Sequence, residues 1–302
     1  MSKETLKMPS YGGQALIEGI LMRGKSNLAV AMRAPDGSIV IQKERLQGIY
    51  TSKFTKIPFL RGLVLLWDAF GLGIRYLTIS ANTQTGEDEK IEGASLIFTV
   101  IFSLAIAVGL FFLAPAGLVE LLDNFLNIST FASNLLEGLL RLLLIVGYIW
   151  GVGFMPDIRR VFSYHGAEHK TINAFEAGVE LTVENVQKHS VQHPRCGTAF
   201  ILTLVVFSII LFSIIGPLPP VWRIASRVLL LPLLAMLAYE YIRFTSKISR
   251  TLIGKALAAP NLALQNLTTR QPTDQMVEVA LAAFNTMLAE EQKDAGLAEP
   301  IT

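Results

Sequence analysis

Four long runs of apolar residues dominate the pattern of hydrophobic and polar positions along the chain. They lie at 94–117, 139–155, 197–215 and 221–241. The first and third carry no charge, the second carries only Arg141, and the fourth has Arg223 and Arg227 near its start, where long basic side chains can reach the membrane surface. Runs of about this length cross a hydrocarbon core of about 30 Å as helices. We therefore predict a mainly α protein, a polytopic membrane bundle of about four transmembrane helices.

A fifth stretch, 57–80, is apolar except for three charged residues. Arg61, Asp68 and Arg75 are seven residues apart and would share one stripe of a helix. The pattern predicts an amphipathic helix over 58–80 that lies in the membrane interface, or packs against the bundle with Asp68 between the two arginines. A buried amphipathic helix of ordinary character fits equally. The three charges disfavour a transmembrane helix here, which would invert the orientation given below.

Polar segments flank these runs. Residues 28–33 and 38–42 are β-prone and enclose the turn signal 34–37, so we predict a β-hairpin within an N-terminal region, 1–57. That region has no apolar segment typical of a cleavable signal. The tail has a helical pattern over 274–291, which Thr273 or Asp274 can cap.

Composition and charge set the orientation. Hydrophobic residues make up 52% of the chain and charged residues 17%, against roughly 25% charged in soluble domains. Lys and Arg are absent from 118–138 but gather in 157–196 and in both flanking regions, so the positive-inside rule places both termini and 157–196 in the cytoplasm. The net charge of +2, without a basic stripe, argues against a nucleic-acid partner. The predicted order is an N-terminal region (1–57), an interfacial helix (58–80), transmembrane helices 1 and 2 (94–156), a cytoplasmic loop (157–196), transmembrane helices 3 and 4 (197–241) and a cytoplasmic helical tail (242–302).

The chain's metal-binding residue types are concentrated in the predicted loop. All four histidines and the only cysteine lie between 165 and 196, and His165 to His169 has the form H-x-x-E-H. A helix from His165 to Ala177, closed by Gly178, would place both imidazoles one turn apart, the spacing at which two histidines bind one zinc ion. Glu168 would then be the general base of a zinc-dependent hydrolase.

A catalytic zinc ion needs a third protein ligand. His193 is the first choice, followed by Cys196, Glu176 and Glu184. Three histidines with Cys196 would instead form a closed structural zinc site. Two further alternatives are a Cys196 nucleophile activated by a histidine, and ordinary interface residues without a site.

Residues 19–26 match the phosphate-binding pattern G-x-x-x-x-G-K-S. That loop requires a helix after the motif, whereas here an extended run and a Pro-Asp-Gly turn follow. We therefore do not predict a nucleotide site.

Four motifs in order resemble the YqhQ-like bacterial membrane proteins, over about residues 10–288. They are GGQALIEGILMRG at 12–24, YHGAEHK at 164–170, HPRCGT at 193–198 and LTTR at 267–270. The function of that family is unknown, and a metal-dependent enzymatic activity has been suggested for it. The resemblance implies that His165, Glu168, His169, His193 and Cys196 are motif positions. It adds Gln14, Glu18 and Arg23 as candidate site residues, although a glycine-rich packed strand also explains that stretch.

The functional prediction is hydrolysis that depends on a divalent metal, zinc by preference, at the cytoplasmic face of a bacterial inner membrane. The substrate would be a membrane-associated peptide or lipid-like molecule. The alternative is a non-enzymatic membrane scaffold or membrane-protein assembly factor with a structural metal. A transporter is disfavoured because polar residues within the runs are scarce. Gly147-x-x-x-Gly151 would permit close helix approach, within one chain or in a homo-oligomer.

Overall fold

The N-terminal region forms a four-stranded antiparallel sheet. The computed structural model describes residues 11–85, 90–216, 218–249 and 251–296. Within them the strands follow one another in the order β1-β2-β3-β4, with bounds β1 (Gly12–Leu16), β2 (Gly19–Arg23), β3 (Asn27–Arg33) and β4 (Ile39–Arg45). The predicted hairpin is confirmed, since β3 pairs with β4 and Gly37 has a φ of 88° in the turn. Residues 19–26 form a strand and a turn into another strand, so the phosphate-binding pattern lacks the helix it would need.

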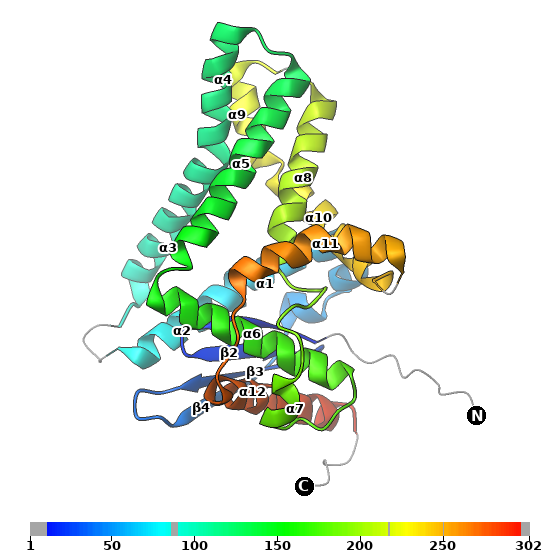
Figure 1. Cartoon of the computed structure of the whole chain (residues 1–302). Helices are drawn as coiled ribbons and strands as arrows, with labels where there is room; N and C mark the ends of the chain where they lie inside the picture. The colour runs from blue at the N-terminus through cyan, green and yellow to red at the C-terminus, as the bar shows by residue number, and fades with distance from the viewer. Residues whose placement is uncertain (1–10, 86–89, 217, 250, 297–302) are drawn as a thin grey trace.

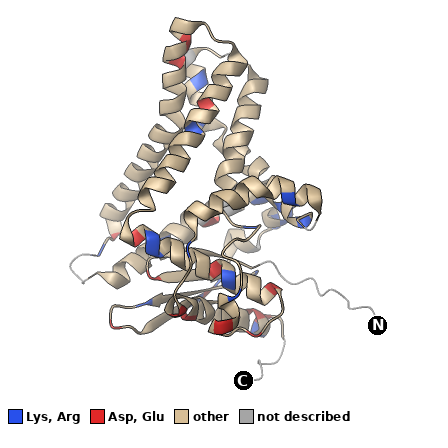
Figure 2. Ribbon diagram, in the orientation of Figure 1, with Lys and Arg blue, Asp and Glu red and all other residues tan. Residues whose placement is uncertain are grey.

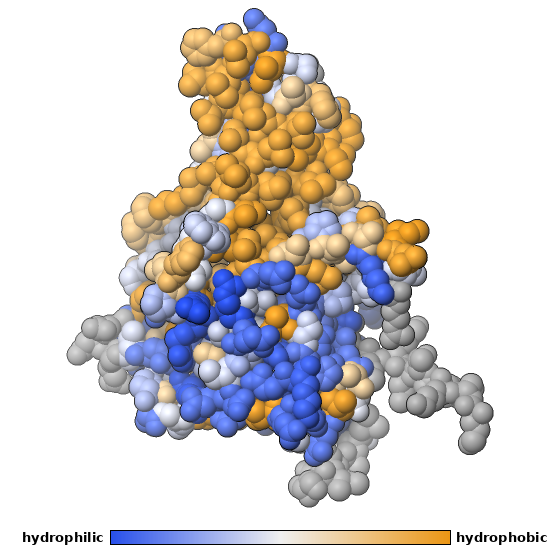
Figure 3. Space-filling model, in the orientation of Figure 1, coloured by the Kyte–Doolittle hydropathy of each residue, from blue (hydrophilic) through white to orange (hydrophobic). Residues whose placement is uncertain are grey.

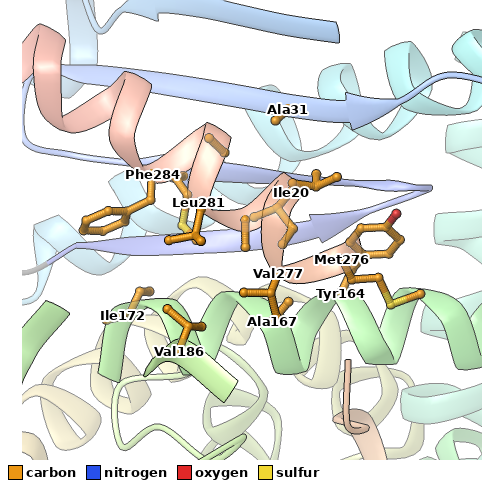
Figure 4. Close-up of a cluster of buried hydrophobic side chains, with 14 of the residues drawn as sticks. Ile20, Ala31, Tyr164, Ala167, Ile172, Val186, Met276, Val277, Leu281 and Phe284 are labelled. Carbon is orange, nitrogen blue, oxygen red and sulfur yellow. The ribbon is translucent and has the colours of Figure 1, made fainter. Parts of the chain in front are cut away.

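Both faces of this sheet are covered, which explains why β2 and β3 are buried almost throughout. Ile20, Met22, Ala29 and Ala31 point to one face, where α12 (Asp274–Asp294), α6 (Pro156–Glu176) and α7 (Val183–Gln187) pack (Figure 4). Leu21, Leu28, Val30 and Met32 point to the other, where Leu72 and Tyr76 of the 60–84 helix pack. The sheet, α2 (Ile74–Gln84), α6, α7 and α12 together form what we call the sheet layer.

The rest of the chain forms a helical bundle that rises from the sheet layer (Figure 1). The remaining elements are η1 (Gly48–Thr51), η2 (Lys53–Lys56), α1 (Leu60–Asp68), the π-helix η3 (Ala69–Gly73), α2 (Ile74–Gln84), α3 (Gly93–Val108), the π-helix η5 (Gly109–Leu113), α4 (Ala114–Leu126), α5 (Thr130–Val152), α8 (Thr198–Ile215), α9 (Pro220–Leu229), α10 (Leu231–Lys247) and α11 (Leu252–Thr268). The chain is thus mainly helical with a small sheet, as predicted.

Three helices in the described residues are long and apolar enough to cross a membrane, namely 60–84, 93–126 and 130–152. The pair α9 and α10, bent by 46°, is a fourth candidate, and the apolar helix at Phe200–Ile215 is shorter. The predicted runs therefore correspond to helices, although α3, η5 and α4 extend the first run to Leu126 and a bend divides the last. On the face that Figure 3 shows, mainly apolar side chains cover the bundle and mainly polar ones cover the sheet layer.

The helix over 60–84 differs from the expectation in two ways. It is long and apolar enough to be a candidate span, which its three charges had disfavoured, and those charges have other partners than predicted. Asp68 does not lie between Arg61 and Arg75 but forms an ion pair with Arg23 of β2. Arg61 pairs with Glu240 of α10, and Arg75 pairs with Glu44 of β4. The charged stripe faces other parts of the protein because α1 packs on α10 and α2 packs on the sheet.

Gly147 and Gly151 lie on α5 with open space where their side chains would be. No helix among the described residues therefore packs closely on them, and the predicted close approach within one chain is not seen.

Candidate metal centre

Helix α6 carries the H-x-x-E-H motif between the bundle and the sheet. Pro156 at its first turn separates it from α5, and Gly178, with a φ of 70°, follows its end. The helix is longer than predicted, because it begins at Pro156 rather than near His165. Residues 188–197 and the end of α11 lie over one of its sides, while β1 lies on another.

His165, His169 and Cys196 converge. One nitrogen of each histidine and the Sγ atom of Cys196 all lie within 4.8 Å of one another. The Nε2 atom of His165 is 3.2 Å from Sγ, and the two imidazole centroids are 4.3 Å apart. His169 and Cys196 are buried and His165 is half-buried, so the group lies at the edge of the interior. Of the predicted third ligands, the structure brings in Cys196.

Backbone carbonyls fix both imidazoles. His165 Nδ1 donates to Thr268 O at 2.9 Å, and His169 Nδ1 donates to Val191 O at 2.6 Å. A carbonyl oxygen only accepts, so each neutral ring carries its proton on Nδ1 and has its lone pair on Nε2. Burial lowers the pKa of His169 and favours that neutral form. Its buried Nε2 makes no hydrogen bond of ordinary geometry among the described residues, and the neighbouring thiol is the group that interacts with it.

The loop that supplies Val191 is held from two sides by residues that the sequence did not single out. From α6, the Lys170 ammonium donates to the carbonyls of Gln187 and His189, and the Asn173 amide donates to those of Ser190 and Gln192. From α11, the Gln265 side chain bonds both the N–H and the C=O of His193. These contacts fix the loop and place Cys196 beside α6.

The backbone of the motif at 267–270 binds α6 and helps to orient His165. Thr268 provides the carbonyl that holds His165, and Arg270 N–H donates to Phe162 O of α6. At Gly166 a Cβ would overlap the carbonyl oxygen of Arg270, so only glycine lets the chain pass this close. The only signal in the sequence for the contact between residues 267–270 and α6 was that these residues form one of the four family motifs.

His193 lies next to the converging group but outside it. Its ring centroid is 5.8 Å from that of His169, and its Nε2 atom lies 3.6 Å from a carboxylate oxygen of Glu176. Glu176 also forms an ion pair with Arg195. Burial alone would raise the pKa of Glu176, but His193 and Arg195 together lower it. These three residues therefore form a neighbouring polar group of their own.

Glu168 points toward the sheet. Its carboxyl group packs against Gly13 of β1 and accepts a hydrogen bond from the backbone there. Burial raises its pKa to about 7, and protonation of His165 would act in the opposite direction. Its oxygens are not among the atoms that converge with Cys196.

The other predicted residues lie elsewhere. The Gln14 side chain contacts Gly73 of η3, and Arg23 pairs with Asp68. Glu18, in the β1–β2 turn with a φ of 51°, binds Arg160 and Tyr164 of α6 and so ties the sheet to that helix. Glu184 pairs with Lys188 at the surface.

The donor set fits a transition metal. Two imidazole nitrogens and a thiol are ligands that zinc prefers, and histidines that ligate zinc usually donate their second N–H to a carbonyl or carboxylate. Both Nδ1 atoms here do so.

The comparisons with known proteins give a family and no function. The family model described as "Protein of unknown function (DUF1385)" matches residues 57–290. A relative from Bacillus subtilis (strain 168), described as "Uncharacterized protein YqhQ", is 37% identical over 305 residues, covering 95% of each chain. No solved structure matches. The chain therefore belongs to this family of unknown function, in agreement with its motifs.

Proposed function

We propose that this member of the family is a membrane-integrated, zinc-dependent hydrolase whose metal is held by His165, His169 and Cys196. The convergence of these three side chains, with both rings fixed by backbone carbonyls, carries the proposal. Three protein ligands leave a fourth position open, as catalytic zinc sites require.

A zinc ion bound there would supply a Lewis acid and lower the pKa of a coordinated water to about 7. Residues of the chain would orient the zinc ligands and accept the proton of the coordinated water. The carbonyls of Thr268 and Val191 orient the two imidazoles, and Gln265 holds the loop that leads to Cys196. Glu168 remains our proposed general base because it adjoins His169 and interacts with His165, but its carboxyl group must turn away from Gly13 to act.

We also propose that the site faces the cytoplasm at a bacterial inner membrane. The distribution of Lys and Arg along the chain supports the cytoplasmic side. A position at the membrane surface is supported by the short connections to the apolar helices, since α6 begins four residues after α5 ends and Cys196 lies two residues before α8. A peptide or lipid-like substrate that lies at the membrane surface would be within reach of such a site.

Metal content is the decisive measurement. Protein extracted in detergent without chelators is expected to contain one zinc ion per chain. His165→Ala, His169→Ala and Cys196→Ser should each lower zinc affinity at least about 100-fold, more than the loss of an outer-sphere partner does. His189→Ala is the matched control, because His189 lies outside the converging group and should leave zinc content unchanged. Wild-type protein without stoichiometric metal would refute the site.

Glu168→Gln separates catalysis from metal binding. In a hydrolase, this variant keeps zinc and loses hydrolysis of amphiphilic ester or amide substrates, because the amide cannot accept a proton. A variant that keeps both zinc and activity would remove Glu168 from the mechanism.

A structural zinc site in a scaffold or assembly factor is the second candidate, and His193 favours it. This buried ring has an Nε2 atom without a hydrogen bond among the described residues, and a rotation toward His169 would bring a fourth ligand. Cobalt-substituted protein would distinguish the two, since His193→Ala changes its absorption spectrum only if His193 is a ligand.

A further inference from the structure

The stretch from the end of α10 through α11 has an unusual charge pattern. Residues 241–273 contain no Asp or Glu, although the whole chain has nearly equal numbers of acidic and basic residues. The basic residues of this segment are Arg243, Lys247, Arg250, Lys255 and Arg270. A segment with one sign of charge binds the opposite sign, so its partner should be anionic.

The structure places apolar side chains among these basic ones. Leu252, Ile253 and Phe244 are 86%, 69% and 54% exposed. Arg243, Lys247 and Lys255 are exposed too, and no ion pair involves them in the part of the chain that the structure describes, although Arg243 lies near enough to Glu240 to lower its pKa. We call these six residues the α10–α11 anchor. Figures 2 and 3 show basic and strongly apolar residues side by side at the outer end of α11.

A helix cap and close backbone packing support the exposed side chains of the anchor. The Thr251 hydroxyl caps α11 by accepting a hydrogen bond from Gly254 N–H. A Cβ at Gly254 would overlap the carbonyl oxygen of Ile248, so the turn is closely packed beneath the exposed side chains. Leu252 and Ile253 are therefore held outward by a folded turn, and exposing them to water is unfavourable.

The position of the anchor indicates its partner. It follows the bent candidate span α9–α10, at the end of the bundle next to the sheet layer. Apolar side chains beside basic ones at the end of a span are typical of segments that insert into the headgroup region, with the basic groups on lipid phosphates. A soluble anion would satisfy Lys255 but would leave Leu252 and Ile253 in water.

A similar combination of apolar and basic side chains recurs near α10, just before α1. In and after η2, Phe54, Ile57 and Phe59 are exposed beside Lys53 and Lys56. Phe59 N–H donates to Glu240 near the end of α10, so this surface adjoins the same end of the span.

We infer that the α10–α11 anchor inserts Leu252 and Ile253 into the membrane interface and binds anionic phospholipids through Arg243, Lys247 and Lys255. The inference depends on the proposed membrane insertion and is independent of the zinc site. Failure of the metal measurement would leave it standing, and its own failure would leave the zinc site standing.

The test uses full-length protein in lipid nanodiscs of phosphatidylcholine with or without phosphatidylglycerol. In the Leu252→Trp variant, the fluorescence of the new tryptophan is measured after subtraction of the wild-type emission. Brominated acyl chains test its contact with lipid, and aqueous iodide tests its contact with water. We expect quenching by the lipid, stronger with phosphatidylglycerol, and protection from iodide. Val40→Trp, on β4 of the sheet layer, is the control that iodide should quench.

Lipid selectivity gives the second measurement. The variant Arg243→Gln/Lys247→Gln/Lys255→Gln should lose at least about fivefold in phosphatidylglycerol enrichment by native mass spectrometry, the factor expected for a single basic residue near an anionic surface. The charge-matched control Lys25→Gln/Lys43→Gln/Lys293→Gln should keep it. The inference is overturned if iodide quenches the Leu252→Trp variant in both lipid mixtures. It is also overturned if the two triple variants enrich phosphatidylglycerol equally. An acidic protein would then be the partner to seek.

Discussion

The sheet layer and the bundle place their charges in opposite ways. In the sheet layer, apolar side chains fill the space on both faces, and ion pairs such as Lys43–Glu290 lie at the surface. In the bundle, apolar side chains cover the outside, while Glu137, Arg141 and Arg227 are at most 3% exposed. A surrounding membrane would account for this inversion, because lipid accommodates apolar side chains but leaves a charge unsolvated.

The comparison also indicates what holds each part together. The main cluster of the sheet layer contains eighteen buried apolar residues, whereas that of the bundle contains three, among the residues described. The bundle is joined instead by polar contacts. The Arg141 guanidinium donates to Phe111 O of η5, to the Ser208 hydroxyl of α8 and to Glu137, and Arg227 of α9 binds Glu137 as well. Its stability should therefore depend on few residues.

The largest effect is expected from Glu137→Gln. Without this carboxylate, two buried arginines lose their counter-charge, at a cost of about 3–5 kcal/mol in the free energy of unfolding. Chemical unfolding in detergent micelles measures it. The matched variant in the sheet layer, Glu290→Gln, removes surface pairs with Lys43 and Lys293 and should leave the unfolding midpoint unchanged. Similar shifts of the unfolding midpoint in the two variants would show that the bundle does not depend on its charge pairs more than the sheet layer does.

A smaller effect is expected where the two parts meet. In Gly166→Ala the new methyl group displaces the backbone of Arg270 and, with it, the Thr268 carbonyl that orients His165, so stability should fall by about 1–3 kcal/mol. Zinc affinity should fall about 10- to 100-fold, as when an outer-sphere partner is lost. Gly147→Ala, with open space around it on α5, is the control and should be neutral or slightly stabilising. Unchanged zinc affinity in Gly166→Ala would mean that Thr268 has no part in the site.

The smallest effect concerns the pH dependence of the contact between the sheet and α6. The hydrogen bond from Arg160 lowers the pKa of Glu18 below its ordinary value of 4.5. The stabilisation is therefore complete above that ordinary value and is lost as the pH falls through the lower, folded-state pKa. Because Arg160 is half exposed, Glu18→Gln should cost less than about 1 kcal/mol near pH 7 and nothing in strong acid. A cost that grows toward low pH would contradict this assignment.

Local features of this fold could be predicted from the sequence. The apolar runs correspond to helices, the hairpin at 28–42 has its turn in place, and Thr273 caps α12 by accepting from Met276 N–H. The approach of His165 to His169 could also be predicted, since one helical turn separates them, whereas the first choice for the third ligand was His193 and the structure brings in Cys196 instead.

Contacts between distant elements could not be predicted in the same way. Periodicity identifies the charged stripe of the 60–84 helix but not the element that covers it, so Asp68 was assigned to the arginines of its own helix instead of Arg23. The contact of Glu168 with β1 could not be predicted for the same reason. Glu168 lies about 100° around the helix from His169, and a strand that was not predicted from the sequence occupies that side. The carbonyls of Thr268 and Val191 gave no signal, since every residue has one.

One consequence concerns synthesis on the ribosome. Strands β1 to β4 end at Arg45, yet the helix that covers one of their faces, α12, begins only at Asp274. At 5–20 residues per second, translation of the intervening segment takes roughly ten to fifty seconds. Throughout that interval Ile20, Met22 and Ala31 lack their final cover while the apolar helices are being made. The sheet thus leaves the ribosome well before the helix that completes its cover, and a nascent chain stalled before residue 274 should be a substrate for chaperones.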